Sequence, residues 1–211
     1  MEYNYFVIEG NIGAGKTSLV TRLGEELKAK IILERFADNP FLPKFYSDPD
    51  RYSFPVELSF LADRYHQLKE ELSTRNIFSS LIIADYYFSK SLIFASNTLK
   101  QDEYNLYRQI YNIIHRHFPL PDLYIYLHLP VDRLLSHIRK RDRDYEQTIT
   151  AEYLMKLQTK YFEYFKVQRD MKILIIDISN IDFVNNLNDY LIIRDYILNE
   201  KHLAGINRII L

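Results

Sequence analysis

Short apolar runs recur along the chain, and stretches whose apolar residues follow helical spacing separate them. The runs cover residues 3–9, 30–34, 80–84, 122–129 and 172–177. Strands that alternate with helices in this way are typical of a parallel sheet covered by helices on both faces. The pattern therefore predicts an α/β fold with a five-stranded parallel sheet. Because ligands of such sheets bind beyond the carboxyl ends of the strands, the residues that follow each run are the candidates for function.

A glycine-rich sequence follows the first run. It reads Gly10, Asn11, Ile12, Gly13, Ala14, Gly15, Lys16 and Thr17, with Ser18 after it. This is the phosphate-loop pattern G-x-x-x-x-G-K-[ST], placed between a buried strand and a helical pattern over residues 18–27. Backbone N–H groups of such a loop turn toward phosphate oxygens, and the following helix adds its positive dipole end. Lys16 is expected on the β- and γ-phosphates of a nucleoside triphosphate and Thr17 on Mg²⁺, although a glycine-rich turn can also simply join a strand to a helix.

The charge and composition exclude several classes of protein. The 211 residues include 47% hydrophobic ones, which predicts one folded domain over residues 1–211. A formal net charge of −1 argues against a protein that binds a nucleic-acid polymer through its global charge. The chain has no cysteine, which excludes disulfides and thiolate metal sites. A strand begins within a few residues of Met1 and no apolar run reaches membrane-spanning length, so we expect a soluble cytoplasmic protein.

Two acidic residues stand directly after predicted strands. Glu34 ends the second run on the phosphate-loop side, where a carboxylate can accept the proton of an attacking hydroxyl; an exposed surface glutamate is the alternative. Asp85 ends the third run, where a carboxylate directed at Mg²⁺ is expected beside Thr17. Asp85 could also cap a helix that begins near Tyr86.

Further helical patterns bring in other polar residues. Asn39 and Pro40 predict the N-cap and the first position of one helix. A longer helical stretch, about 51–74, contains Glu57 and Arg64, which are two turns apart and therefore share a face. The two residues form either a solvated surface pair or, as the apolar residues beside them indicate, part of a partly buried face.

A cluster of cations lies between the fourth and fifth runs, in a helix that Pro130 opens. Its members are Arg139, Lys140, Arg141 and Arg143. In a phosphate-loop protein such a cluster predicts a lid, about 137–150, whose arginines clamp the transferred phosphoryl group. A solvated helix end is the alternative, and the lid is favoured because no other arginine is apparent near the phosphate loop. The loop 177–183 after the fifth run could border a nucleotide base, or it is merely a turn, and no role follows from the sequence for the segment after Asn199.

Taken together, these residues resemble the deoxynucleoside kinase family, enzymes that phosphorylate deoxynucleosides at the 5′-hydroxyl. The resemblance spans nearly the whole chain. Besides the phosphate loop, it rests on Asn39-Pro40-Phe41-Leu42, Lys44-Phe45-Tyr46, Tyr52-Ser53-Phe54, Ile93-Phe94-Ala95, Arg141-x-Arg143 and Asp177 to Phe183. It implies a P-loop kinase fold with an arginine-rich lid, ATP and Mg²⁺ as cofactors, a purine deoxynucleoside as substrate, and a homodimer.

The resemblance also implies roles for single residues on the acceptor side. Glu34 matches the family's general base on the 5′-hydroxyl. Tyr46 and Glu146 match the pair that hydrogen-bonds the sugar 3′-hydroxyl, and a tyrosine under the sugar favours deoxyribose. Asp85 belongs to the acceptor side as well as to the metal site. Three residues fall where family members read the base edge: Glu57, Arg64 and Lys90.

On the donor side, Lys16, Arg141 and Arg143 match catalytic cations, and Asp182 and Phe183 match the loop against the donor adenine. The chain departs from the family in two places near the phosphates. Most members carry an acidic-Arg-Ser triplet where this chain has Ala84-Asp85-Tyr86. His137 stands where many members have a lid arginine, for which Arg139 is a candidate substitute.

The base pocket differs too, because Glu57 and Lys90 replace the family's common glutamine and aspartate. An ionised glutamate matches the N1–H and N2–H₂ donors of guanine, and the two cations match its acceptors. Adenine would leave Glu57 a worse partner, at a cost of about 1–3 kcal/mol. We therefore predict deoxyguanosine as the acceptor, followed by deoxyadenosine or broad specificity.

Two other functions are weighed against this one. A nucleoside monophosphate kinase such as thymidylate kinase would need extra cations for an acceptor phosphate, and no spare set is apparent near Glu34 or Tyr46. A GTP-driven switch would carry an N-K-x-D sequence, which the chain lacks.

Overall fold

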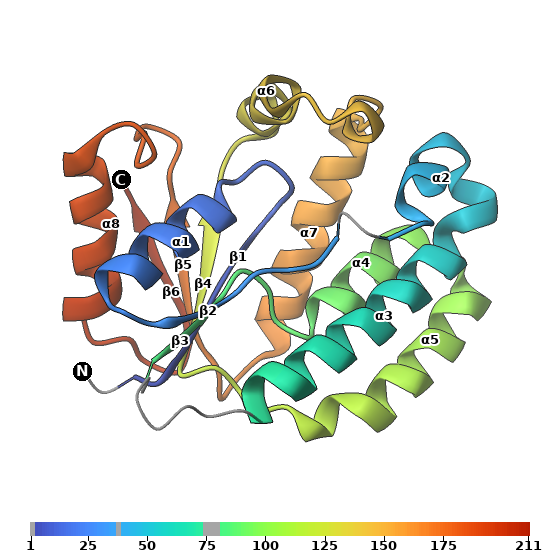
Figure 1. Ribbon diagram of the computed structural model, residues 1–211, viewed down its shortest axis with the longest axis horizontal. Coiled ribbons are helices and arrows are strands. Elements are labelled where there is room, and N and C mark those ends of the chain that lie inside the picture. Colours follow the sequence, from blue (N-terminus) through green and yellow to red (C-terminus); the bar gives the residue numbers. More distant parts are fainter. Residues whose placement is uncertain (1–2, 37–38, 74–80) are drawn as a thin grey trace.

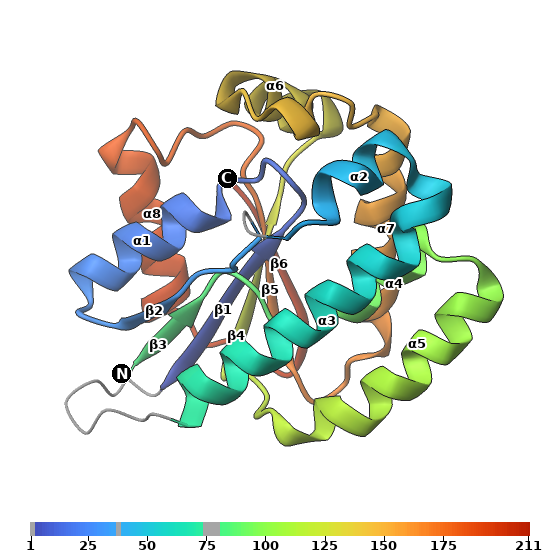
Figure 2. The same ribbon diagram turned by 45° about the vertical axis from the view of Figure 1, so that its right-hand side comes forward.

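A parallel β-sheet runs through the middle of the molecule (Figures 1 and 2). The computed structural model describes residues 3–36, 39–73 and 81–211, and among these residues six strands pair in the order β2-β3-β1-β4-β5-β6. All neighbouring pairs are parallel. The strands are β1 (Tyr5–Gly10), β2 (Lys30–Ile32), β3 (Ile82–Ala84), β4 (Leu123–His128), β5 (Lys172–Asp177) and β6 (Gly205–Ile210). The parallel α/β architecture is therefore confirmed.

The predicted number of strands was wrong, because β6 forms in the segment after Asn199, for which no role followed from the sequence. Among the described strands, β6 pairs with β5 alone, in the register Lys172↔Gly205 to Asp177↔Ile210. As an edge strand it is not buried on both faces, and Ile206, Arg208 and Ile210 are exposed. A continuous apolar run marks a strand buried on both faces, so the mixed sequence of β6 escapes that pattern.

Helices cover both faces of the sheet (Figure 1). On one side lie α1 (Lys16–Glu26) and α8 (Leu187–Asn199), and on the other lie α3 (Pro49–Ser73), α4 (Lys90–Thr98), α5 (Gln101–Ile114) and α7 (Ala151–Val167). The two cores follow from the alternation of side chains along a strand. In β1, Phe6 and Ile8 pack with the first group of helices, whereas Tyr5 and Val7 pack with the second.

The remaining short helices lie beyond the carboxyl ends of the strands, at the top of Figure 1. They are α2 (Leu42–Ser47) and α6 (Val131–Arg141), with a 3₁₀ turn Asp144–Glu146 after α6; a second 3₁₀ turn, His115–His117, follows α5. None of the described helices combines the length and the apolar character that crossing a membrane requires.

Two predicted helix starts were wrong. The Asn39 side chain accepts a hydrogen bond from the N–H of Phe41 over 2.9 Å and so shapes a turn, and α2 begins only at Leu42. The helix expected near Tyr86 begins at Lys90. Asp85 does not cap it, because both oxygens of its carboxylate have other partners, described below.

Candidate active site

The glycine-rich loop 10–17 joins β1 to α1, as predicted. Gly13 and Gly15 have φ angles of +85° and +84°, a left-handed conformation that favours glycine. The Lys16 ammonium donates hydrogen bonds to the carbonyls of Gly10 and Asn11, at 3.0 and 2.9 Å, and so lies across the loop. Burial, together with the nearby charge of Lys90, lowers the pKa of Lys16 to about 8. The loop thus presents a partly desolvated cation beside the N-terminus of α1.

Two cavities meet at this loop. We call them the inner cavity, about 760 Å³ between α2, α3, α4 and α7, and the outer cavity, about 1550 Å³ along α6 and the loop after β5. The residues that line both mark the junction: Gly13, Lys16, Thr17, Glu34, Phe36, Asp85, Arg141 and Arg143. Two small molecules, one in each cavity, would approach each other there.

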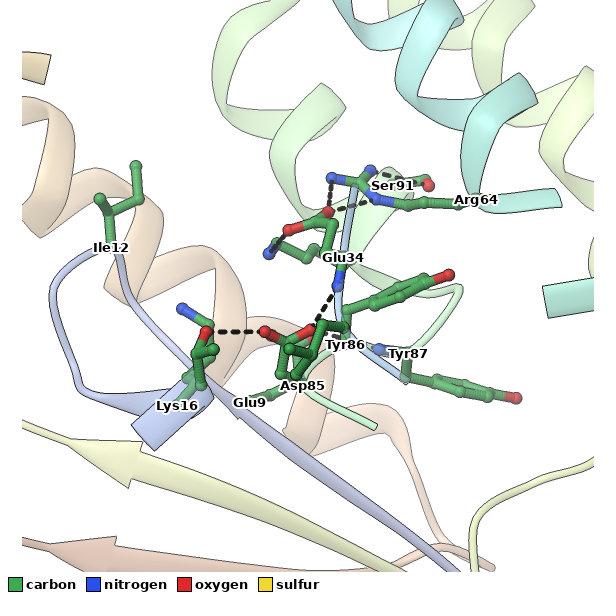
Figure 3. Close-up of polar contacts among 12 residues, drawn as sticks. Glu9, Ile12, Lys16, Glu34, Arg64, Asp85, Tyr86, Tyr87 and Ser91 are labelled. Carbon is green, nitrogen blue, oxygen red and sulfur yellow. Dashed lines mark hydrogen bonds and ion pairs between the residues drawn. The ribbon is translucent and has the colours of Figure 1, made fainter. Parts of the chain in front are cut away.

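Glu34 lies at the junction with both carboxylate oxygens in ion pairs. Arg64 contacts Oε1 through Nε and Nη2, at 2.8 and 2.7 Å (Figure 3), and the Lys90 ammonium lies 2.5 Å from Oε2. Burial by itself would raise the pKa of Glu34, but attraction by Lys90 and Arg64 outweighs it and lowers the pKa to about 2. The side chain is 10% exposed, so the alternative of a surface glutamate is wrong.

Asp85 and Thr17 lie side by side at the same junction. The Thr17 hydroxyl donates to Asp85 Oδ2 over 2.8 Å, and the N–H of Glu34 donates to Oδ1 over 2.7 Å (Figure 3). Burial, followed by the charge of Glu34, raises the pKa of Asp85. Hydroxyl and carboxylate oxygens are ligands that Mg²⁺ prefers. In the described part of the chain, no group of three or more His, Cys, Asp or Glu residues is arranged to hold a metal.

Glu57 lines the inner cavity and is 3% exposed. Its Oε1 accepts a hydrogen bond from the Thr98 hydroxyl over 2.9 Å, whereas Oε2 is buried without a hydrogen-bond partner among the described residues. Burial, opposed by the charge of Arg64, raises the pKa of Glu57 to about 7. The ionised carboxylate that the sequence interpretation assumed therefore predominates only above about pH 7.

Arg64 and Lys90 lie in the inner cavity, but their charges are directed at Glu34 rather than held free for a base. Arg64 makes a further hydrogen bond, from Nη1 to the Ser91 hydroxyl at 2.9 Å. The predicted grouping of Glu57, Arg64 and Lys90 around one cavity is thus found. The pairing of the two cations with Glu34 was not foreseen.

The segment 141–146 closes over the junction. The buried carboxylate of Glu146 accepts hydrogen bonds from Arg141 and, at 3.2 Å, from Arg143. The ring of Tyr145 stacks on that of Tyr46 with 6.1 Å between centroids. Tyr46 and Glu146, expected as a pair, both line the inner cavity, and the two arginines line both cavities.

One face of α6 supplies cations to the outer cavity. The His137 ring nitrogen Nδ1 lies 2.9 Å from the carbonyl oxygen of Gly13. Arg139, the candidate substitute for a lid arginine, does not line either cavity, whereas Arg133 lines the outer one. The expectation that no arginine outside the cluster lies near the loop was therefore wrong. A spacing of four residues, from 133 to 137 to 141, places these side chains on one helix face and could have revealed Arg133.

The loop after β5 forms the far wall of the outer cavity through Asp182 and Phe183, as expected. A residue that the sequence reasoning missed holds this wall in place. Arg22 of α1 donates from Nη1 to the carbonyl of Phe183 over 3.0 Å. Its guanidinium also lies 3.9 Å from the centroid of the Tyr190 ring in α8.

Comparisons with known proteins identify the family of the chain. A family model for deoxynucleoside kinase matches residues 6–200. A deoxyguanosine kinase of Bacillus subtilis is 35% identical over 190 residues, which cover 88% of this chain and 92% of the relative. A deoxyadenosine kinase of Dictyostelium discoideum is 32% identical over 168 residues, 79% of this chain and 68% of the relative. Among solved structures, deoxyadenosine kinase from M. mycoides with bound dCTP matches with a TM-score of 0.77 and 26% identity, covering 92% of this chain and 98% of that one. The chain therefore belongs to the deoxynucleoside kinase family and is an ATP-dependent deoxynucleoside kinase.

Proposed function

We propose that the chain transfers the γ-phosphoryl group of ATP to the 5′-hydroxyl of a purine deoxynucleoside, and that deoxyguanosine is its best acceptor. ATP occupies the outer cavity, with loop 10–17 as its phosphate-binding loop, and the deoxynucleoside occupies the inner cavity. The observation that carries this assignment is the position of Glu34, an ionised carboxylate where the two cavities join. Residues 1–211 act as one kinase domain, and we expect a homodimer.

The reaction follows from the groups at the junction. The 5′-oxygen forms a bond to the γ-phosphorus while the bond from that phosphorus to the β–γ bridging oxygen breaks, and the electron pair of the broken bond stays on ADP. The hydroxyl proton passes to the Glu34 carboxylate. Lys16 neutralises charge on the β- and γ-phosphates, and Arg141 and Arg143 act on the transferred group from the lid over residues 137–150. Catalysis is then mainly positioning and electrostatic stabilisation.

Thr17 and Asp85 are the residues that would hold Mg²⁺. When bound there, the ion neutralises phosphate charge and orients the triphosphate. The N–H of Glu34 donates a hydrogen bond to Asp85, and this bond fixes the backbone of the general base Glu34 relative to Thr17 and Asp85.

The sugar and the base are both recognised in the inner cavity. Tyr46 and Glu146 hydrogen-bond the 3′-hydroxyl, and the tyrosine ring leaves no space for a 2′-hydroxyl. Glu57 faces the base with its unpartnered oxygen, and in its ionised form it accepts both hydrogen bonds from N1–H and N2–H₂ of guanine. The deoxyguanosine and deoxyadenosine kinases among the relatives support a purine acceptor.

The test is phosphoryl transfer from Mg-ATP to four deoxynucleosides, guanosine and dGMP by the purified protein. We expect the highest kcat/KM with deoxyguanosine, and little transfer to guanosine or dGMP. A higher value with deoxyadenosine or a pyrimidine would keep the reaction and refute the base assignment. Transfer to dGMP alone would point to a monophosphate kinase, and ATP hydrolysis that no nucleoside stimulates would point to a nucleotide switch.

A further inference from the structure

The reacting centre contains a buried cation that the base-recognition assignment does not explain. The residue after Asp85 is Tyr86, whose hydroxyl donates to the side chain of Gln67 over 2.9 Å, away from the junction (Figure 3). It therefore supplies no charge to the phosphates. The next cation along the chain is Lys90, the first residue of α4, whose side chain is 7% exposed.

Lys90 and Arg64 both hold Glu34. All three guanidinium nitrogens of Arg64 are held, Nε and Nη2 by Glu34 and Nη1 by Ser91. Among the described residues, Lys90 has one hydrogen-bond partner, Glu34 Oε2 at 2.5 Å. An ammonium has three donors, so two are left for a ligand. Because Lys90 lines the inner cavity and pairs with Glu34, these remaining donors lie beside the group that takes the 5′-hydroxyl proton in the proposed reaction.

Geometry also places Lys90 at the junction. It lines the inner cavity together with Lys16 and Asp85. Glu57, the residue assigned to the base, lines the same cavity and lies within the influence of the Lys90 charge. The ion pair of Lys90, however, is with the carboxylate of Glu34 at the transfer point.

We propose that Lys90 is a catalytic residue whose ammonium contacts the transferred phosphoryl group, and that it does not read the base. This inference rests on the proposed function. In the transfer step the 5′-oxygen bonds to the γ-phosphorus, the bond to the bridging oxygen breaks with its electron pair going to ADP, and the hydroxyl proton passes to Glu34. Protonation removes the negative charge that had balanced Lys90. The positive charge of Lys90 therefore becomes unbalanced in a buried site while negative charge moves onto the bridging oxygen, so its stabilising effect is larger in the transition state than in the ground state.

The test compares Lys90→Met with the wild type on deoxyguanosine and deoxyadenosine at saturating Mg-ATP. We expect kcat to fall by about 10²–10³ with both nucleosides, as for other groups that stabilise charge in a transition state. The ratio of the two kcat/KM values and the nucleoside KM should stay within about twofold. Lys90→Arg, which keeps the charge, should recover part of the rate.

A residue that reads the base would give the opposite result, namely a changed nucleoside ratio and a raised KM with kcat preserved, and that result would overturn the inference. An inactive wild type would instead refute the proposed function itself. The two failures are thus distinguishable.

If Lys90→Met fails to fold, a second variant at the same position tests the proposal. Because the chain has no cysteine, Lys90→Cys carries a unique thiol. Alkylation with 2-bromoethylamine in urea, followed by refolding, rebuilds an ammonium at this position. We expect kcat to rise at least about tenfold over the same protein alkylated with iodoacetamide. Equal activity of the two alkylated proteins would show that the charge at residue 90 is not catalytic.

Discussion

The Thr98 hydroxyl donates a hydrogen bond to one oxygen of Glu57, a residue in the wall of the inner cavity, and leaves the other, buried oxygen without a hydrogen-bond partner among the described residues. This single contact orients a carboxyl group whose pKa burial raises to about 7. The neutral group offers one donor and one acceptor, which suit N1 and N6–H₂ of adenine, whereas the ionised group offers two acceptors, which suit guanine. We therefore expect the protonation state of this one side chain to select between the two purines.

The first prediction is that base preference depends on pH. As pH rises from 6 to 8.5, the ratio of kcat/KM for deoxyguanosine to that for deoxyadenosine should increase, up to about tenfold, with a midpoint near 7. Glu57→Gln, which does not titrate, should give a flat ratio shifted toward deoxyadenosine. A parallel rise of the ratio in wild type and variant would assign the pH effect to another group.

The same residue predicts a pH-dependent stability. The folded pKa of Glu57 lies above that of an exposed glutamate, so its contribution is complete below about pH 4.5 and is lost as pH rises through about 7. Glu57→Gln should therefore gain stability relative to the wild type between pH 5 and pH 8.5, by about 2 kcal/mol. Urea unfolding at the two pH values measures the change, and a difference that does not vary with pH would contradict it.

Glu34→Gln should lower kcat by about 10²–10⁴ while the KM for ATP stays near normal, because the amide cannot accept the hydroxyl proton. The pKa of Glu34 is about 2, so its protonation should not limit kcat above about pH 4. Steady-state rates between pH 5 and 9 test both statements. Glu152→Gln, a change at an exposed glutamate of α7, is the matched control and should behave as the wild type. Near-full activity of Glu34→Gln would remove this residue from the role of general base.

Asp85→Asn should raise the Mg²⁺ concentration for half-maximal activity at least about tenfold, since a neutral amide oxygen is a poorer Mg²⁺ ligand than a carboxylate. The amide oxygen can still accept the N–H of Glu34, so the backbone contact is preserved. Thr17→Val should act in the same direction, and Thr17→Ser, which keeps the hydroxyl, should not. Titrations of activity with Mg²⁺ at fixed ATP measure this concentration for each variant. Equal curves for Thr17→Val and Thr17→Ser would exclude the hydroxyl as a ligand.

Gly15→Ala should weaken ATP binding. A Cβ at this position would lie 2.9 Å from Phe183, and the φ of +84° is strained for alanine. Gly205→Ala is the matched control, because its φ is also positive, +89°, but nothing lies within 4 Å of the added carbon. Both variants should lose about 1 kcal/mol of stability, whereas only Gly15→Ala should raise the dissociation constant of ATP, measured by calorimetry. If Gly15→Ala and Gly205→Ala lose a similar amount of ATP affinity, the effect comes from backbone strain alone.

The sequence predicts the centre of this fold well and its edge poorly. In β1 and β4 the residues Tyr5–Ile8 and Leu123–Leu127 are apolar because helices cover both faces of these strands, and that burial is visible as a run of apolar residues. In β6 the exposed positions are Ile206, Arg208 and Ile210, and Arg208, with the half-buried Asn207 beside it, interrupts the run. The start of the helix after β3 was misplaced because the Asp85 carboxylate can accept hydrogen bonds from several partners. The sequence does not say which partner it selects.

The candidate site shows the same limit. Helix geometry was enough to place Glu57 and Arg64 on one face, and the resemblance to the family added Lys90 to them. It could not show that both cations reach Glu34, which depends on how α3 and α4 pack against the end of β2. It also could not show that Glu57 loses its hydration, because the pKa of a carboxyl group depends on side chains far away in sequence.

The edge strand β6 has a practical consequence for anyone who shortens this protein. The family match ends at residue 200, and a chain cut at that boundary would lose all of β6. The backbone groups of β5 that now pair with it would be left open, and an unpaired, apolar strand edge invites association with other chains. Since β5 leads directly into the loop that carries Asp182 and Phe183, such a fragment should precipitate readily and bind ATP weakly, although every catalytic residue proposed above would still be present.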